Sequence, residues 1–139
     1  MVDQNCAYCV EGDLVAKFGI KICELETSKV YLFKEQSHPG RCIVAHKKHV
    51  GDMNELTAEE RAAYFEDVAR VARAIMKAFN PDKVNYGAYG DTGHHLHFHL
   101  CPKYKDEFEW GGVFLMNPDK KYLTDAEYAE MIEKIKANM

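Results

Sequence analysis

The stretch His95-Leu96-His97-Phe98-His99-Leu100-Cys101 decides how this sequence is interpreted. Histidines alternate with large apolar residues along it, and a period of two is typical of a half-buried β-strand. Successive strand residues point to opposite faces, so the three imidazoles are expected on one face and Leu96, Phe98 and Leu100 in the core. One histidine there would be an ordinary strand residue, but three side by side repel when protonated and are not favoured strand formers. The pattern therefore indicates a functional site on this strand.

Further strands are expected before this motif. Residues 13–26 alternate loosely between apolar and polar, residues 29–33 form an apolar run, and together they are interpreted as two or three antiparallel strands. Residues 41–46 are short, apolar and β-branched at their centre, which is typical of another strand. Residues 84–88 predict a strand that is broken by the glycines around it. The sheet is therefore expected to have about five strands.

Two capping boxes mark the helices. In Thr57-Ala58-Glu59-Glu60 the threonine hydroxyl and the glutamate three residues later satisfy free backbone N–H groups at a helix start. Apolar residues then recur every three or four positions until Asn80-Pro81, which predicts a long helix with one buried face. Thr124-Asp125-Ala126-Glu127 opens a C-terminal helix in the same way. These elements predict an α+β fold on an antiparallel sheet, with one long central helix, in a single domain over residues 1–139.

Composition narrows the classes of function. A chain of 139 residues, of which 47% are apolar, is large enough for one core and too short for two full domains. The formal charge of -4 and the pI near 6.0 argue against a nucleic-acid partner. No apolar run approaches the roughly 20 residues that span a bilayer, and the N-terminus lacks the pattern of a secretion signal. A soluble cytoplasmic protein without nucleic-acid or membrane partners is expected.

The cysteines favour a reduced protein. The chain has five of them, and an odd number in a chain of this size is poorly explained by a disulfide framework. The Cys6-x-x-Cys9 spacing alone leaves buried, redox-active and metal-binding roles open. The pair does not open a helix in a βαβ unit, so no redox motif is indicated.

The motif at residues 95–101 resembles the histidine triad motif, and the chain is similar to that (HIT) superfamily over most of its length. The similarity includes Cys6-Ala7-Tyr8-Cys9, the stretch from Pro39 to His49, the long helix and Asn85-Tyr86. Asn85-Tyr86 and the ending Leu100-Cys101-Pro102-Lys103-Tyr104 look closer to the dinucleoside polyphosphate hydrolase-like branch. The resemblance implies a HIT-like fold. It also implies a nucleotide hydrolase or nucleotidyl transferase acting on a purine nucleotide conjugate, either a dinucleoside polyphosphate or a nucleoside phosphoramidate.

The resemblance also implies a role for each site residue. His97 would attack the α-phosphorus and carry a covalent nucleotidyl group, which suits an imidazole that is neutral near pH 7. Its other ring nitrogen needs an acceptor, which in the family is a backbone carbonyl. His99 would contact the phosphate and help to protonate the leaving group. The remaining nucleotide contacts are expected from the loop residues Thr92 and Gly93, from Asn85, and from Glu35 at the ribose hydroxyls.

A structural zinc ion and a homodimer are further implications of the resemblance. In zinc-containing relatives the matching ligands are those that stand here as Cys6, Cys9, His49 and His95. Two thiolates and two imidazoles make a closed tetrahedral site of the structural kind. Relatives pair through the long helix and the strand near it, and the apolar face from Tyr64 to Phe79 exceeds what one small sheet requires.

Two other functions are compatible with the same residues. In a metal-dependent hydrolase, His95, His97 and His99 would hold a catalytic zinc with an open water position. No Glu or Asp stands in an obvious register beside the triad to support this. In a nucleotide-binding regulator, the same pocket would bind without appreciable turnover. Turnover on a panel of nucleotide conjugates separates the enzyme from the regulator.

Overall fold

The computed structural model describes residues 2–139 and confirms the α+β fold. Its core is a five-stranded antiparallel sheet with the order β1-β2-β3-β5-β4. The strands are β1 Gly19–Glu24, β2 Ser28–Phe33, β3 Cys42–His46, β4 Lys83–Gly87 and β5 His97–Lys103. The strand with the histidine motif, β5, therefore lies inside the sheet between β3 and β4.

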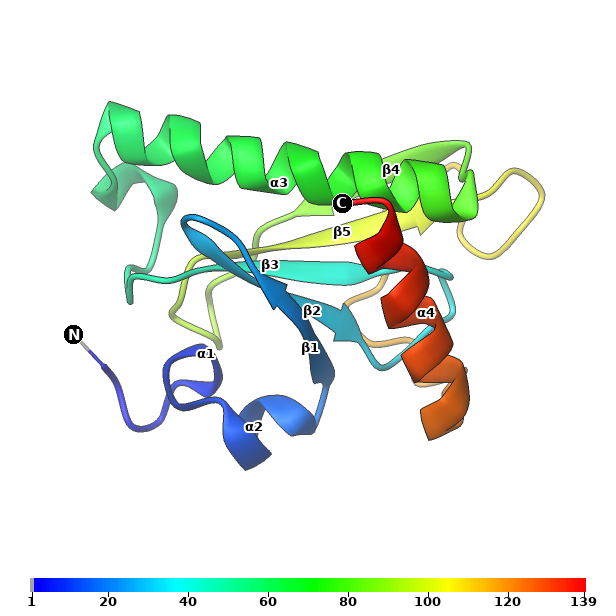
Figure 1. The fold of residues 1–139 in the computed structure, drawn as a ribbon, viewed down its shortest axis with the longest axis horizontal. Coiled ribbons are helices and arrows are strands. Elements are labelled where there is room, and N and C mark those ends of the chain that lie inside the picture. The colour runs from blue at the N-terminus through cyan, green and yellow to red at the C-terminus, as the bar shows by residue number, and fades with distance from the viewer. Residues whose placement is uncertain (1) are drawn as a thin grey trace.

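The long helix α3, Ala58–Phe79, covers one face of this sheet (Figure 1). Its start is the capping box predicted from the sequence, with Glu60 N donating to Thr57 Oγ1 at 3.1 Å. It ends at Asn80, which takes the left-handed conformation with φ 49° that is common after a helix. The C-terminal helix α4, Asp125–Ala137, begins with the second capping box and also contributes to this side of the core.

The two faces of the sheet have different cores. On the α3 side, Leu96, Phe98 and Leu100 pack in one cluster with the apolar residues of α3 and α4, as predicted. On the opposite side a smaller cluster joins β2 and β3 to the N-terminal segment, with Tyr8 and Val15 among its buried members. The histidines of the motif lie on this second side, and two of them, His95 and His97, are in contact with Tyr8. The N-terminal segment thus covers the face that carries the candidate site.

The prediction of a strand from residue 13 was wrong. The chain forms two short helices there, α1 Ala7–Val10 and α2 Gly12–Ala16, and β1 begins only at Gly19. The alternation favoured burial of Leu14 and Ala16, whereas Val15 is the buried side chain of α2. Packing of this segment against β2 and β3 overrides the weak local pattern. A short 3-10 helix, Met53–Glu55, was also missed.

Smaller differences concern the strand ends. The regular ladder of β5 begins at His97 and not at His95, while His46 N still bonds Leu96 O at 2.9 Å. Strand β4 agrees with its prediction to within one residue at each end. No helix among residues 2–139 has both the length and the apolar character required to cross a membrane.

Candidate active site

A cavity of about 980 Å³ opens on the sheet face that carries the histidines. His95, His97 and His99 all line it, and each is almost fully buried. Apolar walls come from three parts of the chain: Tyr8 and Phe18 near the N-terminus, Phe33 and Ile43 in the sheet, and residues 113–116 after β5. The strand alternation predicted from the sequence therefore places three imidazoles at the floor of one apolar pocket.

The central histidine is held with one nitrogen free. His97 Nδ1 donates a hydrogen bond to the carbonyl oxygen of His95 at 2.6 Å, so the proton of the neutral ring lies on Nδ1. Nε2 then carries the lone pair, on a ring that lines the cavity. Burial lowers the pKa of His97 below its usual range, and the ring packs on Tyr8 at 4.9 Å between centroids. The geometry therefore keeps His97 neutral with an unprotonated nitrogen at the cavity.

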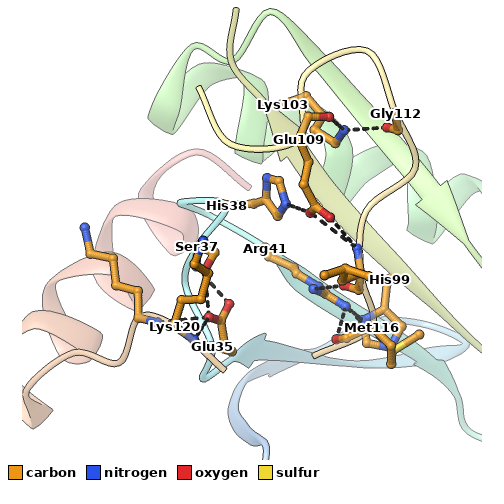
Figure 2. A network of polar contacts seen from close by, with 12 residues as sticks. Glu35, Ser37, His38, Arg41, His99, Lys103, Glu109, Gly112, Met116 and Lys120 are labelled. Carbon is orange, nitrogen blue, oxygen red and sulfur yellow. Dashed lines mark hydrogen bonds and ion pairs between the residues drawn. The ribbon is translucent and has the colours of Figure 1, made fainter. Parts of the chain in front are cut away.

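The last histidine of the motif is held by a different group. The guanidinium of Arg41 donates from Nη2 to His99 Nδ1 at 3.0 Å (Figure 2). Burial, followed by the positive charge of Arg41, lowers the pKa of His99 to about 2. The ring centroids of His97 and His99 are 5.4 Å apart, so both imidazoles can reach one small group in the cavity.

The first histidine belongs to a cluster of four metal-ligand side chains. One ligand atom from each of Cys6, Cys9, His49 and His95 lies within 4.8 Å of all the others. Cys6 Sγ is 3.3 Å from His95 Nδ1, Cys9 Sγ is 3.3 Å from His49 Nδ1, and the two Nδ1 atoms are 3.1 Å apart. Zinc bonds of about 2.3 Å to sulfur and about 2.0 Å to nitrogen give tetrahedral edges of roughly 3.3–3.8 Å. The four donor atoms and the distances between them therefore fit a metal ion with tetrahedral coordination.

His95 connects this cluster to the cavity. Its Nε2–H donates to the carbonyl oxygen of His46 at 2.6 Å, which leaves the lone pair of Nδ1 directed at the two thiols. Burial lowers the pKa of His95 to about 4, so the ring is neutral as a ligand must be. Its own carbonyl oxygen accepts from His97. One residue thus holds the metal-ligand cluster and the orientation of His97 together.

The loop before β5 contributes Asp91, Thr92 and Gly93 to the cavity wall, as expected for the latter two. A Cβ added at Gly93 would lie 3.9 Å from the ring of His97, so glycine keeps the backbone close to that ring without a clash. Thr92 is exposed at the cavity. The carboxylates of Asp91 and Asp3 are the acidic groups of the lining, and the described lining contains no lysine or arginine.

Two residues expected to contact a nucleotide do not line this cavity. Glu35 is 2% exposed, and its carboxylate accepts from Ser37 N, Ser37 Oγ, Lys120 N and Lys121 N. The bonds from Lys120 N and Lys121 N connect the 120–121 segment to the residues that follow β2, and Glu35 does not line the cavity. Asn85 lies in β4 beside a smaller hollow of about 310 Å³. Trp110 is also outside the main cavity and 42% exposed.

Three residues that contact the histidines were not predicted from the sequence. Arg41 was seen only as part of a strand and not as the partner of His99. Tyr8, inside the Cys-x-x-Cys spacing, packs on both His95 and His97. Phe114 follows the motif by a long loop and stands 6.4 Å from the His99 ring. No spacing in the sequence reveals these contacts because each joins segments that are distant along the chain.

Comparison with known proteins identifies the family. The family model described as HIT domain matches residues 19–106, which is more than half of the chain, so the chain belongs to the HIT domain family. The adenosine 5'-monophosphoramidase hnt1 of Schizosaccharomyces pombe is 28% identical over 116 residues, 77% of this chain and 80% of that protein. A bis(5'-adenosyl)-triphosphatase of Dictyostelium discoideum is 29% identical over 98 residues, 67% of this chain and 65% of that protein.

Solved structures have the same fold. A histidine triad (HIT) protein from Sinorhizobium meliloti superposes with a TM-score of 0.84 at 22% identity, covering 92% of this chain and 95% of that one. A Zn-bound histidine triad family protein from Mycobacterium smegmatis superposes with a TM-score of 0.67 at 21% identity, covering 95% and 93%. At these identities the superpositions show a shared fold. Of the two enzymes named above, one is named as a monophosphoramidase and the other as a triphosphatase.

Proposed function

We propose that this HIT-domain protein is a nucleotide hydrolase or nucleotidyl transferase in which His97 attacks the α-phosphorus of a purine nucleotide conjugate. The observation that carries the proposal is the hydrogen bond from His97 Nδ1 to the carbonyl of His95, which leaves Nε2 as a free nucleophile at the cavity floor. The hydrolase class is that of the two named curated relatives, a phosphoramidase and a triphosphatase.

The reaction consists of two displacements at one phosphorus. In the first, the Nε2 lone pair of His97 forms a bond to phosphorus while the bond to the leaving group breaks, and the leaving group departs with a proton from water. In the second, the oxygen of water or another acceptor attacks the nucleotidyl-histidine and the new P–O bond forms while the N–P bond breaks. The electron pair of the N–P bond returns to Nε2, and the proton of the attacking hydroxyl passes to solvent. A low pKa of His97 supports both steps, because the ring stays neutral for attack and is a competent leaving group.

The charge of the cavity lining indicates which class of leaving group the site favours. Asp3 and Asp91 contribute negative charge, and no lysine or arginine of the described chain lines the same space. A dinucleoside polyphosphate brings several more negative charges than a nucleoside phosphoramidate and would meet these carboxylates. The lining therefore favours a phosphoramidate over a dinucleoside polyphosphate. The apolar walls, with Phe18, Phe33 and Ile43, suit the flat face of a base.

Zinc is the ion we propose for Cys6, Cys9, His49 and His95. The donor set, the spacing and the hydrogen bond from His95 Nε2 to His46 O support it, and one solved relative is a Zn-bound protein. The ion would pin the N-terminal segment to the sheet. The chemistry at phosphorus is left to His97 and His99, neither of which belongs to the cluster. This separation argues against the alternative of a catalytic zinc on all three histidines of the motif.

A homodimer is part of the same proposal. Strand β4 is an edge of the sheet, so its outer backbone groups are available to a second copy. Tyr86 on this strand is 50% exposed, and Phe65 and Met76 on α3 are 38% and 41% exposed. A two-fold pairing would cover these side chains. Sedimentation should give a dimer at micromolar concentration that Tyr86→Lys weakens; a wild-type monomer would reject the pairing.

The experiment that tests the mechanism is the stereochemical course at phosphorus. Two in-line inversions give net retention, so a substrate chiral at the α-phosphorus should yield product of unchanged configuration. Mixing the wild type with an activated nucleoside monophosphate and denaturing it in alkali, where the N–P bond is stable, should also trap a nucleotidyl group on His97. Net inversion would indicate direct attack by water and would refute the covalent step. Absence of turnover on both phosphoramidates and dinucleoside polyphosphates would favour the nucleotide-binding regulator.

A further inference from the structure

Arg41 is a fully buried arginine that contacts the last histidine of the motif. It stands immediately before β3 and is 0% exposed. Its guanidinium lies 4.2 Å from the ring centre of Phe33 and 4.9 Å from that of Phe114. It donates to Leu115 O at 3.1 Å, to Met116 O at 2.9 Å and to His99 Nδ1 at 3.0 Å (Figure 2).

The charge of Arg41 has no direct counter-ion in the protein. None of the ion pairs among residues 2–139 includes it. Glu35 and Glu109 act on it only from beyond ion-pair distance, and both are already bonded to other groups. The Nε of Arg41 is buried without a partner among the described residues. A buried guanidinium in this state is unfavourable by itself, so an anion in the neighbouring cavity would compensate it.

The bond to His99 determines where the proton of that ring lies. Arginine has only N–H donors and remains protonated in proteins, so His99 Nδ1 has to accept. The neutral ring then carries its proton on Nε2, which has no partner among the described residues, on a ring that lines the cavity. Resting on the proposed function, we propose that Arg41 is a positioning residue: it fixes His99 as a neutral Nε2–H donor to the phosphoryl group, whose charge compensates the guanidinium.

The surroundings of His99 agree with this assignment. The groups against the ring are Arg41, the neutral ring of His97 at 5.4 Å, and the apolar rings of Phe33 and Phe114 at 5.3 and 6.4 Å. Burial, Arg41 and His97 all lower its pKa. A doubly protonated His99 would also direct an Nδ1–H at a donor of Arg41. The imidazolium form is therefore excluded by geometry as well as by charge.

The two imidazoles then have opposite tautomers for complementary tasks. His97 is bonded through Nδ1–H to a carbonyl and presents a lone pair, whereas His99 is bonded through Nδ1 to a donor and presents a proton. A neutral imidazole N–H is a poor acid, so His99 donates a hydrogen bond to a phosphoryl oxygen and keeps its proton in both displacements. This replaces the expectation that His99 protonates the leaving group.

The direct test is the protonation state of the His99 ring without substrate. In ¹⁵N-labelled holoprotein, two-bond ¹H–¹⁵N correlations should show His99 with Nδ1 unprotonated and Nε2 protonated at about pH 7 and unchanged at about pH 5. The His99→Gln variant assigns the signals. A protonated Nδ1 in the wild type overturns the proposal. Because no substrate is present, this result is independent of whether the covalent intermediate is trapped.

Variants separate positioning from support of the loop. Arg41→Met removes the donor, so His99 should populate the Nδ1–H form and its pKa should rise, while Arg41→Lys should restore the Nε2–H form. Lys103→Met is the matched control, because buried Lys103 anchors the same loop through Glu109 O and Gly112 O without touching His99. Lys103→Met should leave the tautomer unchanged. If it alters the tautomer as much as Arg41→Met does, Arg41 acts only through the loop and the proposal fails.

A kinetic comparison tests the donor role. His99→Gln keeps an N–H donor near the position of Nε2 but has no titratable proton, whereas His99→Leu keeps neither. Turnover of His99→Gln should exceed that of His99→Leu by about tenfold or more, the usual value of a hydrogen bond to a charged group. Equal losses in the two variants would indicate that the proton itself is transferred and would overturn the assignment.

Discussion

The two ends of the histidine motif are held by opposite means. At one end, His95 faces two thiols and a second imidazole, and its far nitrogen is bonded to a backbone carbonyl. At the other end, His99 faces a permanent cation that can only donate. The first arrangement suits a positive ion, and the second suits a negative group. One short segment therefore passes from the proposed cation site to the proposed anion site, with His97 between them.

The difference explains how one residue type serves three tasks. An imidazole can be a ligand, a nucleophile or a donor, and the partner of its other nitrogen decides which. A carbonyl partner frees a lone pair in His95 and His97, while the guanidinium of Arg41 leaves His99 with an outward proton.

The largest effect is expected in the middle of the motif. His97→Ala removes the nucleophile, so turnover should fall by roughly 10³-fold or more, while nucleotide affinity changes by only a few-fold. The reason is that His97 forms its bond in the transition state and contributes little to ground-state binding. Single-turnover rates and equilibrium titration with a nucleoside monophosphate measure the two quantities.

His99→Gln provides the comparison for that variant, because it changes the neighbouring ring and leaves the nucleophile in place. Its loss of turnover should be clearly smaller than that of His97→Ala. Near-normal turnover by His97→Ala, measured on protein free of wild-type enzyme, would contradict the role given to the central histidine.

The next effect concerns the metal-ligand end. Cys6→Ser should reduce the metal content from about one zinc per chain to near zero, because a four-ligand site loses a thiolate. A loss of about 2 kcal/mol would lower the midpoint of thermal unfolding by roughly 5–10 °C in a domain of this size. Elemental analysis and calorimetry measure the two changes.

Cys23→Ser is the matched control for this change. Cys23 is half-buried in β1 and lies outside the cluster, so this variant should keep its metal. His97→Asn should keep it as well. Loss of metal from His97→Asn would favour a zinc held by the triad and would contradict the separation of the two ends.

The sequence predicted the elements of the fold correctly where a local sequence pattern matches the way the segment packs in the structure. The alternation at 95–101, the capping boxes at Thr57 and Thr124, and the period of α3 each predicted an element that the structure contains. The N-terminal helices were not predicted. The loose alternation over residues 13–18 suggested a strand, whereas the packing of this segment becomes visible only in the folded chain. A short apolar segment is ambiguous between helix and strand by period alone.

The candidate site also has a part that could be predicted from the sequence and a part that could not. The metal-ligand cluster assembles the four residues named from the resemblance. The Arg41 end was invisible, because an arginine before a strand has no spacing relation to a histidine 58 positions later. The burial of Glu35 was invisible for a related reason, since its carboxylate accepts from Lys120 N and Lys121 N, which are distant along the chain. Contacts between distant segments depend on the sheet order, which a single sequence does not encode as a motif.

The effect expected at the Arg41 end concerns acid stability and is small for each unit of pH. In the unfolded chain His99 has an ordinary pKa of about 6.5, whereas in the folded protein its pKa is about 2. Between these values the unfolded state binds a proton that the folded state does not. The free energy of unfolding should therefore decrease as the pH is lowered. Below about pH 6 this one group should account for a loss of about 1.4 kcal/mol per pH unit.

The comparison of wild type with His99→Gln isolates this contribution. Other groups, including the carboxylates and the metal ligands, titrate in both proteins, so their contributions cancel in the difference between the two stability curves. Urea unfolding should be measured from about pH 6.5 to about pH 4.5. The free energy of unfolding of the wild type should decrease more steeply than that of His99→Gln, and the difference in slope should correspond to one proton. Arg41→Met should have an intermediate slope, because burial still depresses the pKa of His99 after the positive charge is removed. Parallel curves for wild type and His99→Gln would mean that the folded protein protonates His99 at its ordinary pKa. In that case Arg41 and burial would not keep the ring neutral, and the contrast between the two ends of the motif would be lost.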